Sequence, residues 1–323
     1  MKTLRYSTFV TGLHEPVARL LEENGCEIVL RLDGAVVYEK HGDKIFPCFH
    51  NEFEIIFYEK ISGAKPLDRF AKKILQRQFE NFPRSKNMNN DNNFRIVASI
   101  ENQPAAVDGV LKARLEEKIT KAFGVRPERS GGGLEFWLLY RSEGYAFFMR
   151  RVACNDRKNP ARGELRGDLS YLLNRISSPS EGDIFLDPFC GSGSIPRARK
   201  KYFPCEEIHA FDLEPQKNFK CGRADAFELE NKFPCGYFNK IVTDPPWGIF
   251  GDIEDVEGFY EKMLKSFLRL VSRGGTIVVL TSQKILMRGL LARGEFSSGF
   301  QLLQAYDVLV NGKKAGVFVI ARV

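Results

Sequence analysis

The fold of this chain is decided by two stretches, FLDPFCGSGSIP at residues 185–196 and IVTDPPWG at residues 241–248. In the first, apolar residues from Ile184 predict a buried strand that ends at Asp187, and a helix follows with Pro196 in its first turn. Gly191 and Gly193 allow the tight turn between them, which leaves bare backbone for a ligand and directs helix N–H groups at a carboxylate. No Gly-Lys-Ser/Thr follows, so a P-loop is excluded.

A turn of this kind is typical of sites for dinucleotides and for S-adenosylmethionine, and by itself it does not decide between them or exclude a plain tight turn. The next predicted strand, Glu207–Asp212, ends in an acid that is placed to bind ribose hydroxyls. Asp225 has two interpretations: it holds the adenine amino group, or it caps a helix that begins near Phe227. Only twelve residues separate Asp212 from Asp225. This is too short for a full helix and strand, so the second crossover is predicted to be truncated.

The second stretch predicts a site for a nucleobase. A buried strand delivers Asp244 at its carboxyl end, and Pro245 and Pro246 fix the backbone in a stiff extended turn before Trp247. An exocyclic amino group can donate to the Asp244 carboxylate and the Pro245 carbonyl while the base stacks on Trp247, a contact worth about 1–3 kcal/mol. The carboxylate also offsets positive charge that develops on the nitrogen. The alternative is a proline-rich loop after a core strand.

The rest of the chain predicts two kinds of architecture. In the last third, strands and helices alternate, which is typical of a mostly parallel sheet; Val256–Val271 is a predicted helix and Thr276–Leu280 a predicted strand. The strands Gln301–Val310 and Ala315–Arg322 predict an antiparallel hairpin at the end. The N-terminal half predicts α+β structure, with strands at Tyr6–Val10, Glu27–Leu32, Gly34–Tyr38, Phe94–Ile100, Glu135–Tyr140 and Tyr145–Arg150, helices at Glu15–Asn24, Leu67–Phe79 and Asp108–Phe123, and a loop at Asn87–Asn93.

Composition narrows the class of protein. The chain has 323 residues, 43% hydrophobic and 28% charged, which excludes a disordered protein and indicates two or three domains. No apolar run could span a bilayer, and Glu15 and Pro16 interrupt any signal-peptide core, so a cytoplasmic protein is predicted. The seven scattered cysteines and four histidines lack metal-ligand spacing; no metal is predicted, and the cysteines are predicted to be buried thiols.

The net charge of +7 gives weak support for an RNA partner. The basic residues concentrate in one short stretch, which is interpreted either as a contact for RNA phosphates or as a solvated linker. Its members are Arg150, Arg151, Arg157, Lys158, Arg162 and Arg166.

At DPFCGSGSIP and DPPW the chain resembles the Rossmann-like amino methyltransferases that use S-adenosylmethionine. Upstream, Thr8–Leu13, the helix after it and residues 94–151 resemble the ferredoxin-like and THUMP domains of tRNA and rRNA guanine-N2 methyltransferases. LRGDL at residues 165–169 resembles the helix that precedes the catalytic motifs, although Gly167 stands where a proline is common.

The resemblance implies four parts: a ferredoxin-like domain at residues 1–48, a THUMP-like RNA-binding domain at 49–151, a basic linker with a pre-motif helix at 152–180, and a Rossmann-like methyltransferase domain at 181–323. It implies S-adenosylmethionine as cofactor and methyl transfer at Asp244, Pro245, Pro246 and Trp247. The implied cofactor site consists of Asp187, Pro188, Phe189, Cys190, Gly191, Gly193, Asp212, Leu213, Asp225 and Ala226.

The resulting prediction is an RNA methyltransferase that acts on an exocyclic amino group, with guanine N2 of tRNA as the leading substrate. The same chemistry on rRNA or on adenine N6 stays open, as does a catalytically silent RNA-binding protein. A carbon-5 pyrimidine methyltransferase is a poor alternative, because it needs a cysteine nucleophile that the Asp244 motif lacks.

Overall fold

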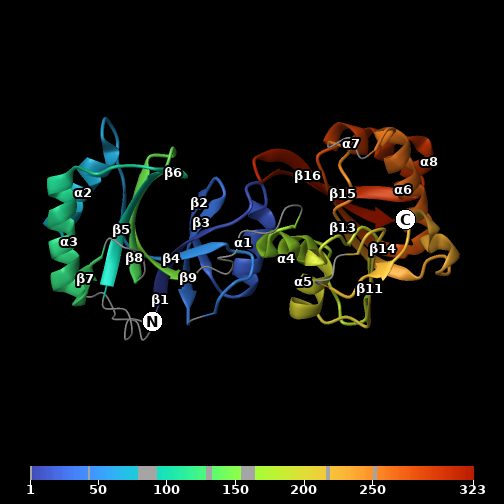
Figure 1. Ribbon diagram of the computed structural model, residues 1–323, viewed down its shortest axis with the longest axis horizontal. Coiled ribbons are helices and arrows are strands. Elements are labelled where there is room, and N and C mark those ends of the chain that lie inside the picture. The colour runs from blue at the N-terminus through green and yellow to red at the C-terminus, as the bar shows by residue number, and fades with distance from the viewer. Residues whose placement is uncertain are drawn as a thin grey trace. The chain divides into compact units, whose positions relative to one another are not determined.

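The computed structural model describes residues 2–42, 44–78, 93–128, 133–153, 164–215, 219–249 and 253–323. By its contacts the chain forms two compact units (Figure 1). The first consists of Met1–Thr8, Asn24–Ile45 and Asn51–Cys154, and the second of Phe9–Glu23, Phe46–His50 and Asn155–Val323. The four predicted domain boundaries stay predictions.

The first unit is built on one nine-stranded sheet, with the order β2-β3-β1-β4-β9-β8-β5-β6 and β7 beside β5. Its strands are β1 (Lys2–Thr8), β2 (Glu27–Leu32), β3 (Ala35–His41), β4 (Asn51–Lys60), β5 (Asn93–Ile100), β6 (Gln103–Pro104), β7 (Arg126–Pro127), β8 (Leu134–Tyr140) and β9 (Tyr145–Ala153). The helices α2 (Pro66–Gln76) and α3 (Gly109–Phe123) lie beside each other along this sheet (Figure 1). Gly124, in the left-handed conformation, caps α3 after Phe123, where the predicted helix ends.

The second unit contains a seven-stranded sheet in the order β12-β11-β10-β13-β14-β16-β15. Its strands are β10 (Ile184–Asp187), β11 (Glu207–Asp212), β12 (Gly222–Arg223), β13 (Phe238–Thr243), β14 (Val271–Thr281), β15 (Phe300–Val310) and β16 (Lys313–Arg322). The pairs from β12 to β14 are parallel, and β16 pairs antiparallel with β14 and β15. The predicted α/β fold, with a mostly parallel sheet and a terminal hairpin, is confirmed.

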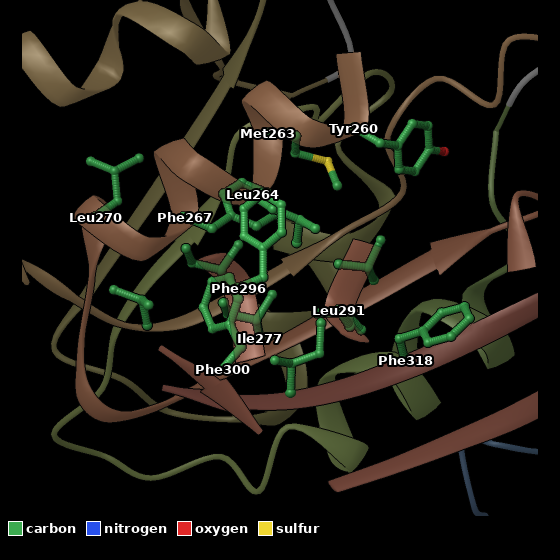
Figure 2. Packing of buried hydrophobic residues seen from close by; sticks show 14 of the residues in the cluster. Tyr260, Met263, Leu264, Phe267, Leu270, Ile277, Leu291, Phe296, Phe300 and Phe318 are labelled. Carbon is green, nitrogen blue, oxygen red and sulfur yellow. The ribbon is translucent and has the colours of Figure 1, made fainter. Parts of the chain in front are cut away.

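Helices cover both faces of this sheet (Figure 1). Its helices are α1 (His14–Glu23), α4 (Gly167–Ile176), α5 (Ser194–Tyr202), η2 (Ala226–Asn231), α6 (Val256–Leu270), α7 (Lys284–Ala292) and α8 (Gly294–Ser297). Figure 2 shows the apolar cluster in which Met263 and Phe267 of α6 meet Ile277 of β14. Because this cluster packs α6 and α7 against the strands, it fixes the loops at the carboxyl ends of β13 and β14.

Two properties of the described residues relate to the predictions about membrane spans and metal binding. No described helix is long and apolar enough to cross a membrane. Within the same ranges, no group of three or more His, Cys, Asp or Glu side chains could hold a metal ion.

Candidate active site

Strand order brings the predicted site residues to one edge of the second sheet. The order reverses between β10 and β13, which are parallel neighbours paired at Leu186 and Ile241. Ligands of open α/β sheets bind outside the carboxyl ends of the strands at such a switch point. Asp187 ends β10, Asp212 ends β11, and Asp244 directly follows β13. The structure therefore gathers three carboxylates where a ligand is expected.

The glycine turn after β10 has the conformation that its sequence requires. Gly191 and Gly193 both have positive φ, 48° and 80°, and Gly193 caps α5. A Cβ atom at Gly193 would lie 2.4 Å from the Cβ of Phe219, whereas one at Gly191 would have no atom within 4 Å. The turn is therefore packed tightly at Gly193 and open at Gly191, where a ligand can approach bare backbone.

The sequence predicts only a ribose contact for Asp212, but its carboxylate also stabilises the glycine turn after β10. Its carboxylate accepts the Gly191 N–H at 2.7 Å through Oδ2 and the Glu214 N–H at 3.0 Å through Oδ1. A carboxylate has about four acceptor positions, so both oxygens can still accept ribose hydroxyls. The predicted ribose contact stays a prediction.

Asp187 is the most deeply buried acid of the site, with 1% of its surface exposed. Its Oδ1 accepts the Thr243 hydroxyl at 2.8 Å and the Phe189 N–H at 3.3 Å, while Oδ2 is buried with no hydrogen-bond partner among the described residues. Burial raises the pKa of Asp187 to about 7 in spite of these bonds, and the charges of Asp244 and Asp212 add to the rise.

This arrangement distinguishes the two ligands that the turn alone left open. An unpartnered buried carboxylate oxygen stabilises a positive group such as an ammonium or a sulfonium, and S-adenosylmethionine carries both. Three neighbouring carboxylates would repel the pyrophosphate of a dinucleotide. The described residues fit S-adenosylmethionine.

Asp244 is half-buried at the start of the loop after β13. Its Oδ1 accepts the indole N–H of Trp247 at 2.8 Å, and no described residue donates to Oδ2. Burial raises the pKa of Asp244 to about 7, and the bond from Trp247 opposes the rise. One carboxylate oxygen is thus fixed by the protein, and the other can accept a further hydrogen bond.

A family model for the RMKL-like methyltransferase domain matches residues 155–197 and 208–300. Over these two segments the chain is similar to that domain. This match contains Asp187, Asp212 and Asp244, and it confirms the predicted family resemblance. S-adenosylmethionine is accordingly the cofactor of the domain.

Relatives of the methyltransferase domain carry names that agree with this family. The chain is 26% identical over 249 residues to a tRNA (guanine(6)-N2)-methyltransferase of Thermus thermophilus, covering 71% of this chain and 72% of the relative. It is 27% identical over 199 residues to the U6 snRNA (guanine-N(2))-methyltransferase THUMPD2 of Bos taurus, covering 56% of this chain but only 38% of that relative. The crystal structure of TrmN from Thermus thermophilus shares the fold, with a TM-score of 0.75, 22% identity and full coverage of both chains.

Asp225 of the methyltransferase domain caps η2, as one of its two interpretations required. Its carboxylate accepts the Phe227 N–H at 2.9 Å. Among the described residues, no helix lies between β11 and β12, and the two-residue β12 pairs directly with β11. This agrees with a truncated second crossover. A contact of Asp225 or of its buried neighbour Ala226 with adenine stays a prediction, as does one of Leu213, which is 61% exposed beside Asp212.

One prediction about the cysteines was wrong. Cys190, in the glycine turn, forms a disulfide with Cys221, which precedes β12. The sequence offered no signal for this pair, because the two residues are 31 positions apart and meet only where the turn folds against the segment from Phe219. Cys26 and Cys48 are buried thiols as predicted, but the thiol of Cys205 is only half-buried and that of Cys235 is exposed. Cys154 lies outside the described residues.

The basic stretch is less available to RNA than its sequence suggested. Arg150 is 3% exposed and pairs with Glu54. Arg151 pairs with Glu135 at 2.8 Å. Arg166 binds Asp168 through two nitrogens. These three side chains offer no uncompensated charge, and the other three members, Arg157, Lys158 and Arg162, lie outside the described residues together with residues 87–92 of the predicted Asn-rich loop.

Proposed function

We propose that this protein transfers the methyl group of S-adenosylmethionine to the exocyclic N2 of a guanine in tRNA. The observation that carries the proposal is the Asp244 carboxylate, which has Oδ1 fixed by Trp247 and Oδ2 open beside the cofactor site. The names of the similar methyltransferases, which act on guanine N2, support this choice of atom. The Thermus thermophilus relative, matched over most of its length, favours tRNA as the substrate.

The cofactor would be held by the turn after β10. The open backbone at Gly191 accommodates its amino-acid part, the unpartnered Oδ2 of Asp187 offers a charge-assisted acceptor to its ammonium group, and Asp212 faces its ribose. When bound, it supplies an electrophilic methyl group. Thr243 donates to Asp187 at 2.8 Å and is followed directly by Asp244, so the cofactor site and the base site share one strand end.

Asp244 orients the guanine amino group for direct displacement. One N–H donates to Oδ2 and a second can donate to the carbonyl of Pro245, which holds the nitrogen lone pair toward the methyl group. As the N–C bond forms and the bond between the methyl group and the cofactor sulfur breaks, positive charge passes from the sulfur to the nitrogen, where the nearby carboxylate stabilises it. The nitrogen then loses one proton, for which Asp244 is the nearest acceptor. No covalent intermediate with the protein is required.

The N-terminal unit is proposed to supply RNA affinity. We assign residues 49–151 to a THUMP-like domain that docks RNA by shape and phosphates, with the target base splayed out of its stack into the Asp244 site. Trp247 would have one of two roles. Either its indole N–H releases Asp244 and the ring stacks on the base, or the N–H stays bonded to Asp244 and orients the carboxylate.

The test is methyl transfer from tritiated S-adenosylmethionine into unmodified tRNA, with the product identified by nucleoside mass spectrometry. We expect N2-methylguanosine, and we expect Asp244→Ala to lower the rate by about 100–1000-fold. A product methylated on adenine N6 or on rRNA alone would replace the proposed substrate. RNA and cofactor binding without any transfer would identify a silent RNA-binding protein.

A further inference from the structure

The loop that carries Pro245 and Pro246 is held from behind by side chains outside the sequence motif. Proline has no N–H, so the backbone of this loop can be anchored there only through its carbonyl oxygens. The Pro246 carbonyl accepts the hydroxyl of Tyr260, from α6, at 3.2 Å. The Trp247 carbonyl accepts a hydrogen bond from Nε2 of Gln283, the N-cap residue of α7, at 2.7 Å. Two consecutive carbonyls are thus fixed by two different elements.

A threonine connects these two anchors. Thr281 Oγ1 lies 2.6 Å from the Tyr260 hydroxyl and accepts the backbone N–H of Gln283 at 3.0 Å. Since Tyr260 donates to Pro246, Thr281 must donate to Tyr260. The chain of donors therefore runs in one direction, from the Gln283 N–H through Thr281 and Tyr260 to the Pro246 carbonyl.

These hydroxyls are buried, so each would destabilise the folded protein if it lacked a hydrogen bond. Tyr260 and Thr281 are both 0% exposed. The ring of Tyr260 belongs to the apolar cluster, and Figure 2 shows its hydroxyl directed away from that cluster. Phenylalanine and valine would satisfy the packing without a desolvation cost, so the two hydroxyls contribute through the loop that they hold.

We propose that Tyr260, Thr281 and Gln283 are positioning residues for methyl transfer, which hold the Pro246 and Trp247 carbonyls and thereby keep Asp244 and Trp247 in reacting geometry. None of the three touches the reacting atoms. The inference rests on the proposed function, because it deepens the account of the same site. Misplacement by about 1 Å can cost as much as 100-fold in rate, so anchors of this kind have kinetic consequences.

The first test compares three variants, each of which removes the hydrogen-bonding group of one side chain: Tyr260→Phe and Thr281→Val lose two hydrogen bonds each, and Gln283→Met loses one. We expect kcat for methyl transfer to fall roughly 10–100-fold while the Kd for S-adenosylmethionine changes less than about twofold. Thr281→Ser, which keeps the hydroxyl, should restore most of the rate. Ser266→Ala is the matched control, because Ser266 lies on the same helix as Tyr260 and its buried hydroxyl has no partner among the described residues.

The second test does not depend on activity. The chain has two tryptophans, and each indole N–H donates to a carboxylate: Trp247 to Asp244 at 2.8 Å, and Trp137 to Glu135 at 3.0 Å. We expect hydrogen exchange of the Trp247 indole, followed by NMR, to accelerate at least about tenfold in the three variants. The Trp137 indole should exchange at the wild-type rate and serves as the internal reference.

The outcomes separate the two proposals. If the wild-type protein methylates no RNA, the proposed function fails, and the exchange experiment still decides whether the network holds the loop. If the wild type is active and all three variants keep its kcat and its Trp247 exchange rate, the network is ordinary core structure and the inference is wrong. Gln283 is only half-buried, so Gln283→Met should fold even if a buried substitution does not.

Discussion

Replacing Asp244 by asparagine separates the charge of the carboxylate from its ability to accept a hydrogen bond. Burial raises the pKa of Asp244 to about 7. The carboxyl is then about one tenth ionised at pH 6 and about nine tenths ionised at pH 8. Because the ionised form accepts the amino group and offsets its charge, wild-type kcat/KM for RNA should rise about tenfold between these pH values.

Asp244→Asn should lose this pH dependence, because an amide does not titrate. We expect its rate to be about 100-fold below wild type at pH 8 and only about tenfold below at pH 6, since the wild type has itself lost most of its active form there. The variant should exceed Asp244→Ala at both pH values, because the amide oxygen still accepts a hydrogen bond.

The titration of other groups near Asp244 must be separated from that of Asp244 in the same assay. Asp187, also with a pKa of about 7, belongs to the proposed cofactor site, so rates are measured at saturating S-adenosylmethionine. Burial raises the pKa of Tyr260 well above the range of the assay. The hydrogen bond from Trp247 lowers the pKa of Asp244, so Trp247→Phe should shift the midpoint of the pH–rate profile to higher pH. An equal ratio of wild type to Asp244→Asn at pH 6 and pH 8 would refute the assignment of charge stabilisation to this carboxylate.

Two further substitutions test the cofactor site. Asp187→Asn should weaken S-adenosylmethionine binding in calorimetry, yet it should stabilise the protein at pH 8 by about 4 kcal/mol. The pKa of Asp187 in the folded protein is raised from 3.8 to about 7, so the wild type loses stability as the pH rises from 3.8 to 7. The gain in melting temperature of the variant should therefore shrink toward zero near pH 4. Asp225→Ala should cost about 1 kcal/mol of unfolding free energy through the lost cap of η2 and should weaken S-adenosylmethionine binding; an unchanged Kd would leave Asp225 with capping alone.

The parts of the site that the sequence predicted are those fixed by local rules. Asp187 and Asp244 come at the ends of short apolar strands, and parallel strands place their carboxyl ends together. Tyr260, Thr281 and Gln283 had no such signal. They meet the loop only through tertiary packing, with Tyr260 14 residues from Pro246 and Gln283 36 residues from Trp247.

One missed strand shows a different limit of sequence reasoning. The sequence of β4 is NEFEIIFYEK, and its first part, Glu52 to Ile55, alternates charged and apolar residues, yet Glu52 and Glu54 are both buried. Their partners come from elsewhere in the sheet: Lys40 of β3 donates to Glu52 at 2.5 Å, and Arg150 of β9 pairs with Glu54. Alternation alone assigns such glutamates to the solvent face, because the compensating cations are invisible until the strands are paired.

The place of α1 in the second unit has a consequence for synthesis on the ribosome. This helix packs with α4, and its Glu15 bonds to Gln304, 289 residues later in the chain. At roughly 5–20 residues per second, about 15–60 s pass between the translation of these two residues. Val17, Leu20 and Leu21 are buried on α1, and α4 begins 144 residues after α1 ends. Until α4 has been translated, α1 lacks this packing partner, and its apolar residues are accessible to chaperones that bind nascent chains.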